Sequence, residues 1–144
     1  MGGLVVLQAA QQFVPHSVIL LEASPPAQIQ GFNPHTEIED GAFDPEVVYG
    51  PFPDDMQARP ESSRARAERK RGISIPDLSC PSLVIYGDSF PSERGTALAS
   101  LYQSDKLNFP GLDHWDLVLA PQVRTAIADW LGRDCPVNGV TTRA

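Results

Sequence analysis

Few side chains in this sequence have both a type and a setting suited to catalysis. Of its three histidines, His114 follows a short predicted strand and the turn at Pro110–Gly111. His16 and His35 lack such a context, and we expect them to be surface or loop residues. Asp88 closes another apolar run. Imidazole and carboxylate groups are the usual general bases and acids of enzymes, so these residues favour acid–base chemistry.

The composition argues against several other kinds of function. A formal net charge of -7 disfavours a nucleic-acid partner or an anionic membrane, because phosphate binding needs a clustered basic surface. The one basic run, Arg64–Arg71, is interrupted by Ala65, Ala67 and Glu68, which is typical of a solvated helix face. The sequence contains no Gly-rich phosphate loop and no cofactor motif, so we expect no cofactor.

The two cysteines favour a reduced, cytoplasmic setting. Cys80 and Cys135 are too few and too far apart for a disulfide framework or a metal site, and we expect no metal. The apolar N-terminal stretch, Met1–Ala10, has no basic segment, and no run approaches the roughly 18 apolar residues of a membrane span. We therefore expect no targeting or anchoring segment.

The elements that must position these residues have the pattern of an α/β domain. Ser17–Glu22 and Ser82–Gly87 are apolar runs typical of strands covered on both faces, and Lys106–Phe109 is a third short strand. Helices are predicted over residues 1–13, 93–103 and 122–131. The apolar faces of the first and last helices are predicted to contain Leu4, Val5, Leu7 and Ala9, and Val123, Ile127, Trp130 and Leu131. Alternation of strand, helix and strand predicts a parallel sheet.

The chain divides into four segments around one compact core. Residues 1–27 are a core helix and strand, and residues 78–133 are a C-terminal core that contains the acid and histidine loops. Between them, residues 28–77 are rich in Gly, Pro, Asp and Glu, with one helix-like stretch at Pro60–Arg71, and form a cap-like excursion. Residues 134–144 have no periodicity and are expected to be a loose tail.

Three features, in their order along the chain, resemble the α/β-hydrolase family. Met1-Gly2-Gly3 before an apolar helix resembles the second half of the nucleophile elbow, G-x-S-x-G-G, in which small residues permit a sharp turn. Cys80–Asp88 (CPSLVIYGD) resembles the penultimate strand, and Phe109–Leu119 (FPGLDHWDLVL) resembles the loop of the catalytic histidine. The resemblance implies a partial α/β-hydrolase fold, with the C-terminal strands of a parallel sheet, flanking helices and a cap-like insertion.

The same resemblance implies roles for individual residues. His114 would be the general base, which takes a proton from the nucleophile and returns it to the leaving group. Asp88 would be the acid that hydrogen-bonds the imidazole. The family pattern here is G-x-x-D, and that register places Phe90 where the carboxylate should be. Glu22, at the end of the preceding strand, and Glu93 are therefore alternatives for the acid.

The nucleophile has no counterpart in this sequence. The matching serine would immediately precede Met1, and neither Ser74 nor Ser89 is followed by the second glycine of the motif. We therefore expect a truncated or mis-started reading frame that is inactive as written. Without the strand that leads into the elbow, the strand at Ser17–Glu22 would present an unpaired apolar edge.

The function that the resemblance implies is hydrolysis of an ester or related bond in a small molecule, with residues 28–77 as a cap over the pocket. Because the nucleophile position is missing, the aspartate nucleophile of dehalogenases and epoxide hydrolases is equally compatible. The alternative from another class is a noncatalytic domain that pairs its exposed sheet edge with a partner or with itself.

Overall fold

The computed structural model describes residues 2–32, 51 and 62–134, and its centre is a three-stranded parallel sheet. The strands, in their order across the sheet, are β1 (Val18–Leu21), β2 (Ser82–Tyr86) and β3 (Asp105–Asn108). The central strand, β2, is buried along its whole length, as its unbroken apolar sequence predicts. The predicted α/β class with a parallel sheet is therefore confirmed.

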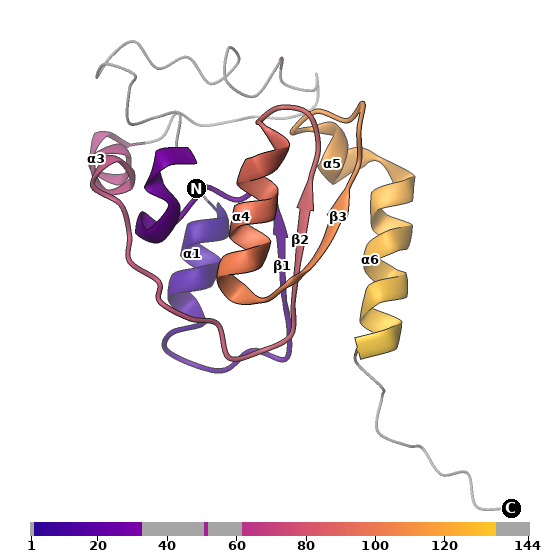
Figure 1. Cartoon of the computed structure of the whole chain (residues 1–144), viewed down its shortest axis with the longest axis horizontal. Helices are drawn as coiled ribbons and strands as arrows, with labels where there is room; N and C mark the ends of the chain where they lie inside the picture. The colour runs from indigo at the N-terminus through magenta and orange to yellow at the C-terminus, as the bar shows by residue number, and fades with distance from the viewer. Residues whose placement is uncertain (1, 33–50, 52–61, 135–144) are drawn as a thin grey trace, which may run out of the picture.

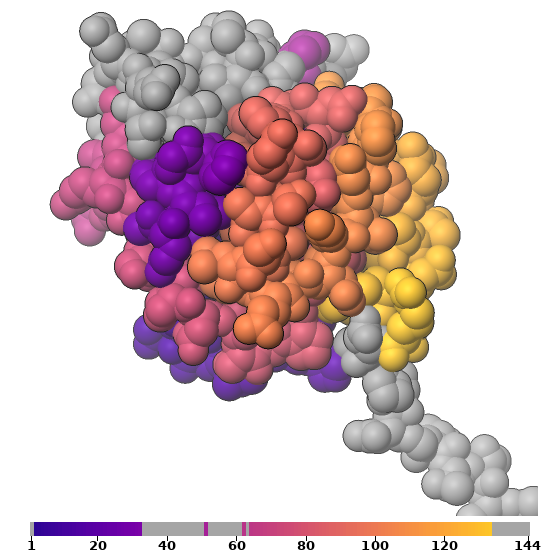
Figure 2. Space-filling model, viewed as in Figure 1, coloured from indigo at the N-terminus to yellow at the C-terminus, as the bar shows by residue number. Residues whose placement is uncertain are grey.

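Helices cover both faces of the sheet. They are α1 (Gly2–Ala9), the kinked 3-10 segment η1 (Ala27–Phe32), α3 (Ser63–Arg71), α4 (Ser92–Tyr102), α5 (Asp116–Leu119) and α6 (Pro121–Asp134). Figure 1 shows α1 and α4 on one face, with α5 and α6 on the other, so the sheet is the middle of three layers. In the space-filling view α4 lies at the front of the molecule, with η1 beside it (Figure 2).

Each face of the sheet has its own hydrophobic core, because successive side chains of a strand point to opposite faces. The core beneath α1 and α4 contains Leu4, Leu7, Val18, Leu20, Ile75, Val84, Tyr86, Leu98 and Tyr102. The core beneath α5 and α6 contains Leu83, Ile85, Leu117, Val123 and Trp130. The indole N–H of Trp130 also donates to the Asp105 carboxylate at 2.8 Å, which ties α6 to β3.

Hydrophobic periodicity located the first and last helices, although α1 ends at Ala9 and not at the predicted Phe13, and one residue was assigned to the wrong face. The predicted side of the last helix is confirmed, because Val123, Ile127, Trp130 and Leu131 all belong to one core. In α1, Leu4 and Leu7 are buried as predicted, but Val5 is 57 % exposed. Val5 lies about 100° around the helix from Leu4, and α1 meets the sheet with Leu4 and Leu7 facing inward, which leaves Val5 at the solvent side.

The chain returns to the core after α3. The Ser62 side chain caps α3 by accepting from the Ala65 N–H at 3.2 Å, so the helix begins later than the predicted Pro60. Further on, Ile75 is fully buried within the α1 and α4 core. Most of the cap-like excursion, His35, Cys135 and the tail from residue 135 lie outside the described residues. Within the described ranges, no helix has the length and apolar character needed to cross a bilayer.

Candidate active site

The carboxyl ends of the three strands bring together the residues that the sequence singled out. Glu22 directly follows β1, Asp88 lies two residues after β2, and His114 lies in the loop after β3. Because the strands are parallel, these ends lie at one edge of the sheet, the upper edge in Figure 1. Open α/β sheets bind their ligands at this edge.

The main contact at this edge joins His114 to Glu22. The imidazole Nδ1 lies 2.9 Å from Glu22 Oε2, and the Gly87 N–H donates to Glu22 Oε1 at 3.1 Å. The Glu22 side chain is 2 % exposed and that of His114 is 24 % exposed. A buried carboxylate requires partners for its charge, and here both oxygens have one. With an ionised carboxylate as its partner, Nδ1 carries the proton and Nε2 is the ring nitrogen that can accept another.

The backbone around Glu22 is constrained. Glu22 has φ 40°, in the left-handed region that residues with a side chain seldom adopt. Its N–H donates to the Ile85 carbonyl at 2.8 Å, which continues the β1–β2 ladder to the turn. The Arg94 Nη2 donates to the carbonyls of Glu22 at 3.2 Å and Ala23 at 2.7 Å. Three hydrogen bonds from other segments thus fix the turn that aims the carboxylate at His114.

The loop that contains His114 is held by short-range contacts at its end. The Asp113 Oδ1 accepts from the N–H groups of Trp115 and Asp116, both at 2.8 Å, while Asp116 Oδ2 accepts from the Asp113 N–H at 3.2 Å. This reciprocal pattern is a capping box at the entry to α5. The His114 N–H donates to Ser89 Oγ at 2.7 Å. These contacts fix the backbone on both sides of His114 independently of any contact that the imidazole makes.

The beginning of the same loop packs against the end of β2. Gly111 has φ 85°, a conformation that glycine adopts without strain. The Asp88 N–H donates to the Leu112 carbonyl at 2.8 Å. A Cβ on Gly87 would overlap that same carbonyl oxygen, so the loop can lie here only because residue 87 has no side chain.

The structure places Asp88 differently from the prediction. Its Oδ2 accepts from the Gly111 N–H at 2.6 Å, and Asp88 is exposed, so its carboxylate holds the loop's turn. The partner of the imidazole Nδ1 is Glu22, the alternative at the end of the preceding strand. Glu93 is exposed on the first turn of α4, with Ser92 Oγ 3.5 Å away. The physical reason for this correction is the turn at Glu22, whose backbone conformation directs the side chain inward.

Neither of the two serines considered as nucleophiles makes a nucleophile–base contact in the structure. Ser89 lies beside His114, but its hydroxyl accepts from the His114 backbone N–H. The hydroxyl of Ser74 accepts from the Gln28 amide at 3.2 Å, on the surface near η1. Met1, which the resemblance would place next to a nucleophile, lies outside the described residues.

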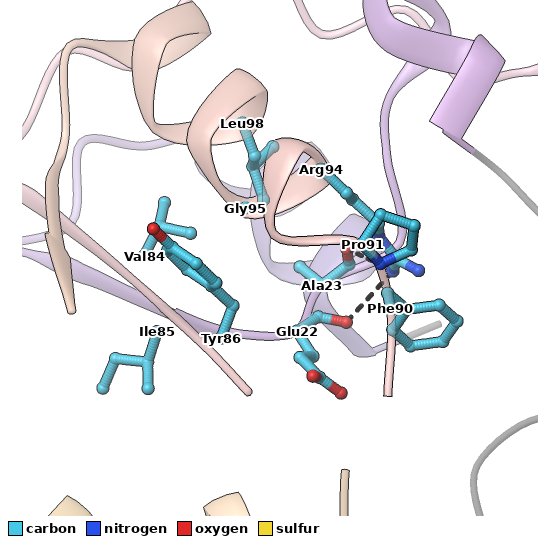
Figure 3. Close-up of a pocket in the computed structure, with 10 residues that line it drawn as sticks. All are labelled: Glu22, Ala23, Val84, Ile85, Tyr86, Phe90, Pro91, Arg94, Gly95 and Leu98. Atoms are coloured by element: carbon cyan, nitrogen blue, oxygen red, sulfur yellow. Dashed lines mark hydrogen bonds between the residues drawn. The ribbon is translucent and has the colours of Figure 1, made fainter. Parts of the chain in front are cut away.

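A small pocket lies behind the acid, between the carboxyl end of β2 and the first turns of α4. Its walls include Glu22, Tyr86, Phe90, Arg94 and Leu98. Figure 3 shows Arg94 reaching from α4 to the backbone oxygens of Glu22 and Ala23, while the Glu22 carboxylate points away from the guanidinium. His114 is not among the lining residues, so the pocket touches the acid but not the base.

Aromatic rings surround the imidazole. Phe90 and Trp115 both meet the His114 ring edge to face, with centroids 6.4 Å and 5.4 Å away and interplanar angles of 87° and 80°. The Arg94 guanidinium carbon lies 3.8 Å from the centroid of the Phe90 ring, on the face of that ring. Sequence reasoning missed Arg94 altogether. The sequence held no clear signal for it, because Arg94 follows Glu93 in the first turn of a helix, a pair typical of an exposed face.

No metal site accompanies these groups in the part of the chain that the structure describes, where no three His, Cys, Asp or Glu side chains cluster suitably. Comparisons of the chain with protein-family models, with curated proteins and with solved structures found no match.

Proposed function

We propose that this chain is the C-terminal part of an α/β-hydrolase of the esterase or lipase type, in which Glu22 is the acid and His114 the general base. The observation that carries the proposal is the 2.9 Å contact between the His114 Nδ1 and the buried Glu22 carboxylate at the carboxyl edge of the sheet. In such enzymes a buried carboxylate fixes the imidazole tautomer and stabilises the imidazolium that forms during the reaction.

The start of α1 supports this proposal. A Cβ on Gly3 would overlap the Cβ of Ala23, the residue that follows Glu22. The first turn of α1 therefore lies against the turn of the acid, and Figure 1 shows the N-terminal end of α1 at the same edge of the sheet. A nucleophile on a turn leading into α1 would lie at the edge that contains Glu22 and His114. This is the arrangement expected of a nucleophile elbow, in which small residues allow close packing.

The proposed reaction passes through an acyl-enzyme. The His114 Nε2 accepts the proton of a serine hydroxyl supplied by a segment before Met1, as the serine oxygen bonds to the acyl carbon of an ester. The imidazolium then gives that proton to the leaving alcohol. Water next attacks the acyl carbon, with Nε2 again accepting the proton, which releases the acid and restores the serine. Because the carboxylate is already aligned, little reorganisation is needed when the imidazolium forms.

The test uses the protein extended upstream in frame, assayed by hydrolysis of p-nitrophenyl acetate. We expect the extension to encode a strand followed by Gly-x-Ser, and His114→Ala to lower kcat by about 10²- to 10⁴-fold. His16→Ala is the control, because His16 is an exposed histidine near the opposite end of β1. A stop codon or unrelated upstream sequence, or a loss below about tenfold in His114→Ala, would contradict the proposal.

A second candidate function is a noncatalytic domain that self-associates through the edge of β1. Among the described residues β1 pairs on one side only, with β2. Exposed apolar side chains lie on the neighbouring α1 and the loop after it, namely Val5, Val6, Phe13 and Val14. An unpaired strand edge is a template for pairing with a second chain. Sedimentation that shows a stable dimer on dilution, together with an inactive extended protein, would favour this candidate.

A further inference from the structure

We propose that Arg94 is a positioning residue, which fixes the backbone of Glu22 in the conformation that presents its carboxylate to His114. This inference rests on the proposed function, because it assigns Arg94 to the acid–base pair of that site. Arg94 acts through the backbone, since its Nη2 donates to the carbonyls of Glu22 and Ala23.

The first argument is the burial of Arg94. The residue is 6 % exposed, although arginine is among the residues least often fully buried. Burying a guanidinium is costly unless strong hydrogen bonds compensate for the lost hydration. Arg94 Nη2 donates to two consecutive carbonyls, those of Glu22 and Ala23. A buried charge that donates twice to one two-residue turn indicates that the position of that turn matters.

The second argument is the conformation of Glu22. Its φ of 40° is unfavourable for a residue with a side chain and persists only when surrounding contacts impose it. Arg94 binds both carbonyls on the C-terminal side of this φ angle, so it opposes relaxation of the turn to an extended backbone. Relaxation would rotate the Glu22 side chain away from the imidazole. Figure 3 shows this division, with the backbone oxygens toward Arg94 and the carboxylate away from it.

The third argument is the place of Phe90. The G-x-x-D register of the sequence places Phe90 where an acid would stand, and the structure instead packs its ring on the Arg94 guanidinium at 3.8 Å. The same ring meets His114 edge to face, 6.4 Å between centroids. One aromatic side chain thus contacts both the base and the residue that holds the acid. The geometry accounts for an acid located after β1 rather than after β2.

The experiment follows the His114 Nδ1–H proton by NMR in the 144-residue chain labelled with ¹⁵N-histidine. In the unaltered chain we expect a downfield resonance that exchanges slowly with water, because the proton lies in a charge-assisted hydrogen bond. In Arg94→Met, which keeps an unbranched side chain but has no donors, exchange should accelerate by at least about tenfold. Arg94→Lys, which restores one charged donor, should recover part of the protection.

Tyr102→Phe is the matched control. It lies on the same helix and loses one buried hydrogen bond, the 3.1 Å contact from its hydroxyl to the Ile75 carbonyl, far from Glu22 in the sequence. A general loss of stability should therefore appear in Tyr102→Phe by urea unfolding, while exchange of the His114 proton stays within about twofold of the unaltered chain. This control separates a positioning role from a merely structural one.

Two further outcomes distinguish a failure of the inference about Arg94 from a failure of the proposed function. If Glu22→Gln leaves the resonance unchanged, the acid assignment fails, and the proposed function fails with it. If Glu22→Gln removes the resonance but exchange in Arg94→Met and Arg94→Lys stays within about twofold of the unaltered chain, only the role of Arg94 is overturned. Should Arg94→Met not fold, Arg94→Lys decides by the same criterion.

Discussion

The turn that carries the acid and the loop that carries the base are held in different ways. Around His114 the local capping box of Asp113 and Asp116 is joined by contacts from Asp88 and Ser89, about 25 positions distant in the sequence. Around Glu22 the contacts come from Gly87 and Arg94, which are 65 and 72 positions distant in the sequence. The comparison teaches that the His114 loop combines a local capping box with contacts to the end of β2, whereas the Glu22 turn is held by contacts from the ends of β2 and α4.

The largest expected effect distinguishes the two carboxylates. In the upstream-extended enzyme, Glu22→Gln should lower kcat for p-nitrophenyl acetate by about 10³- to 10⁴-fold, because an amide cannot stabilise the imidazolium or fix its tautomer. Asp88→Asn should lower it by less than about tenfold, because the asparagine oxygen can still accept from the Gly111 N–H. The reverse order of effects would return the acid role to Asp88.

The next effect concerns the packing of the base loop on β2. Gly87→Ala should destabilise the fold by about 3 kcal/mol, since the added Cβ would overlap the Leu112 carbonyl oxygen. Gly111→Ala should cost only about 1 kcal/mol, because its Cβ would meet nothing within 4 Å and the cost is the φ of 85° alone. Urea unfolding of both variants measures this difference, and equal losses would show that the loop shifts readily.

The stability of the fold should depend on pH through Tyr102, at the C-terminal end of α4. Burial, assisted by the charge of Asp77, raises the pKa of Tyr102 to about 12 from an ordinary value of 10. The folded state therefore keeps the phenolic proton longer, and this contribution to stability is complete below about pH 10 and lost as the pH rises toward 12. The loss should be about 2 kcal/mol and absent in Tyr102→Phe, as measured by urea unfolding at both pH values. An identical alkaline loss in Tyr102→Phe would refute the assignment.

The smallest expected effect tests how much the local capping box contributes to the stability of the loop that contains His114. Asp113→Ala removes the acceptor for the N–H groups of Trp115 and Asp116 and should destabilise the protein by about 1 kcal/mol. Asp113→Ser, which keeps an acceptor at the same position, should cost about half as much or less. Thermal unfolding measures both variants. An Asp113→Ala protein as stable as the unaltered chain would show that long-range packing, and not the capping box, fixes this loop.

Features that depend on neighbouring residues could be predicted from the sequence. The first two strands follow from apolar runs, the short third strand was placed before the Pro-Gly turn, and His114 was singled out by its position after that turn. The four-residue helix α5 was not predicted, because so short a segment shows no periodicity. The prediction that Val5 faces the core was wrong. Periodicity identifies an apolar stripe of residues along a helix but not the angle at which that helix meets the sheet.

The choice of acid depends on information that no local pattern contains. Asp88 and Glu22 both end apolar strands, and either could reach an imidazole at the same edge of the sheet. In the structure Glu22 meets the imidazole, and its positive φ and its contacts with Arg94 both follow from tertiary packing. Phe90 at the position of the family acid was the one hint in the sequence that the carboxylate lies elsewhere.

The most direct test of the Glu22–His114 pair is the NMR resonance of the His114 Nδ1–H proton in the chain itself, compared between Glu22→Gln and Asp88→Asn. Our account predicts that Asp88→Asn leaves the downfield resonance in place and that Glu22→Gln moves it upfield or removes it, because the proton bonds to Glu22 at 2.9 Å. A resonance that survives Glu22→Gln and is lost in Asp88→Asn would contradict the account.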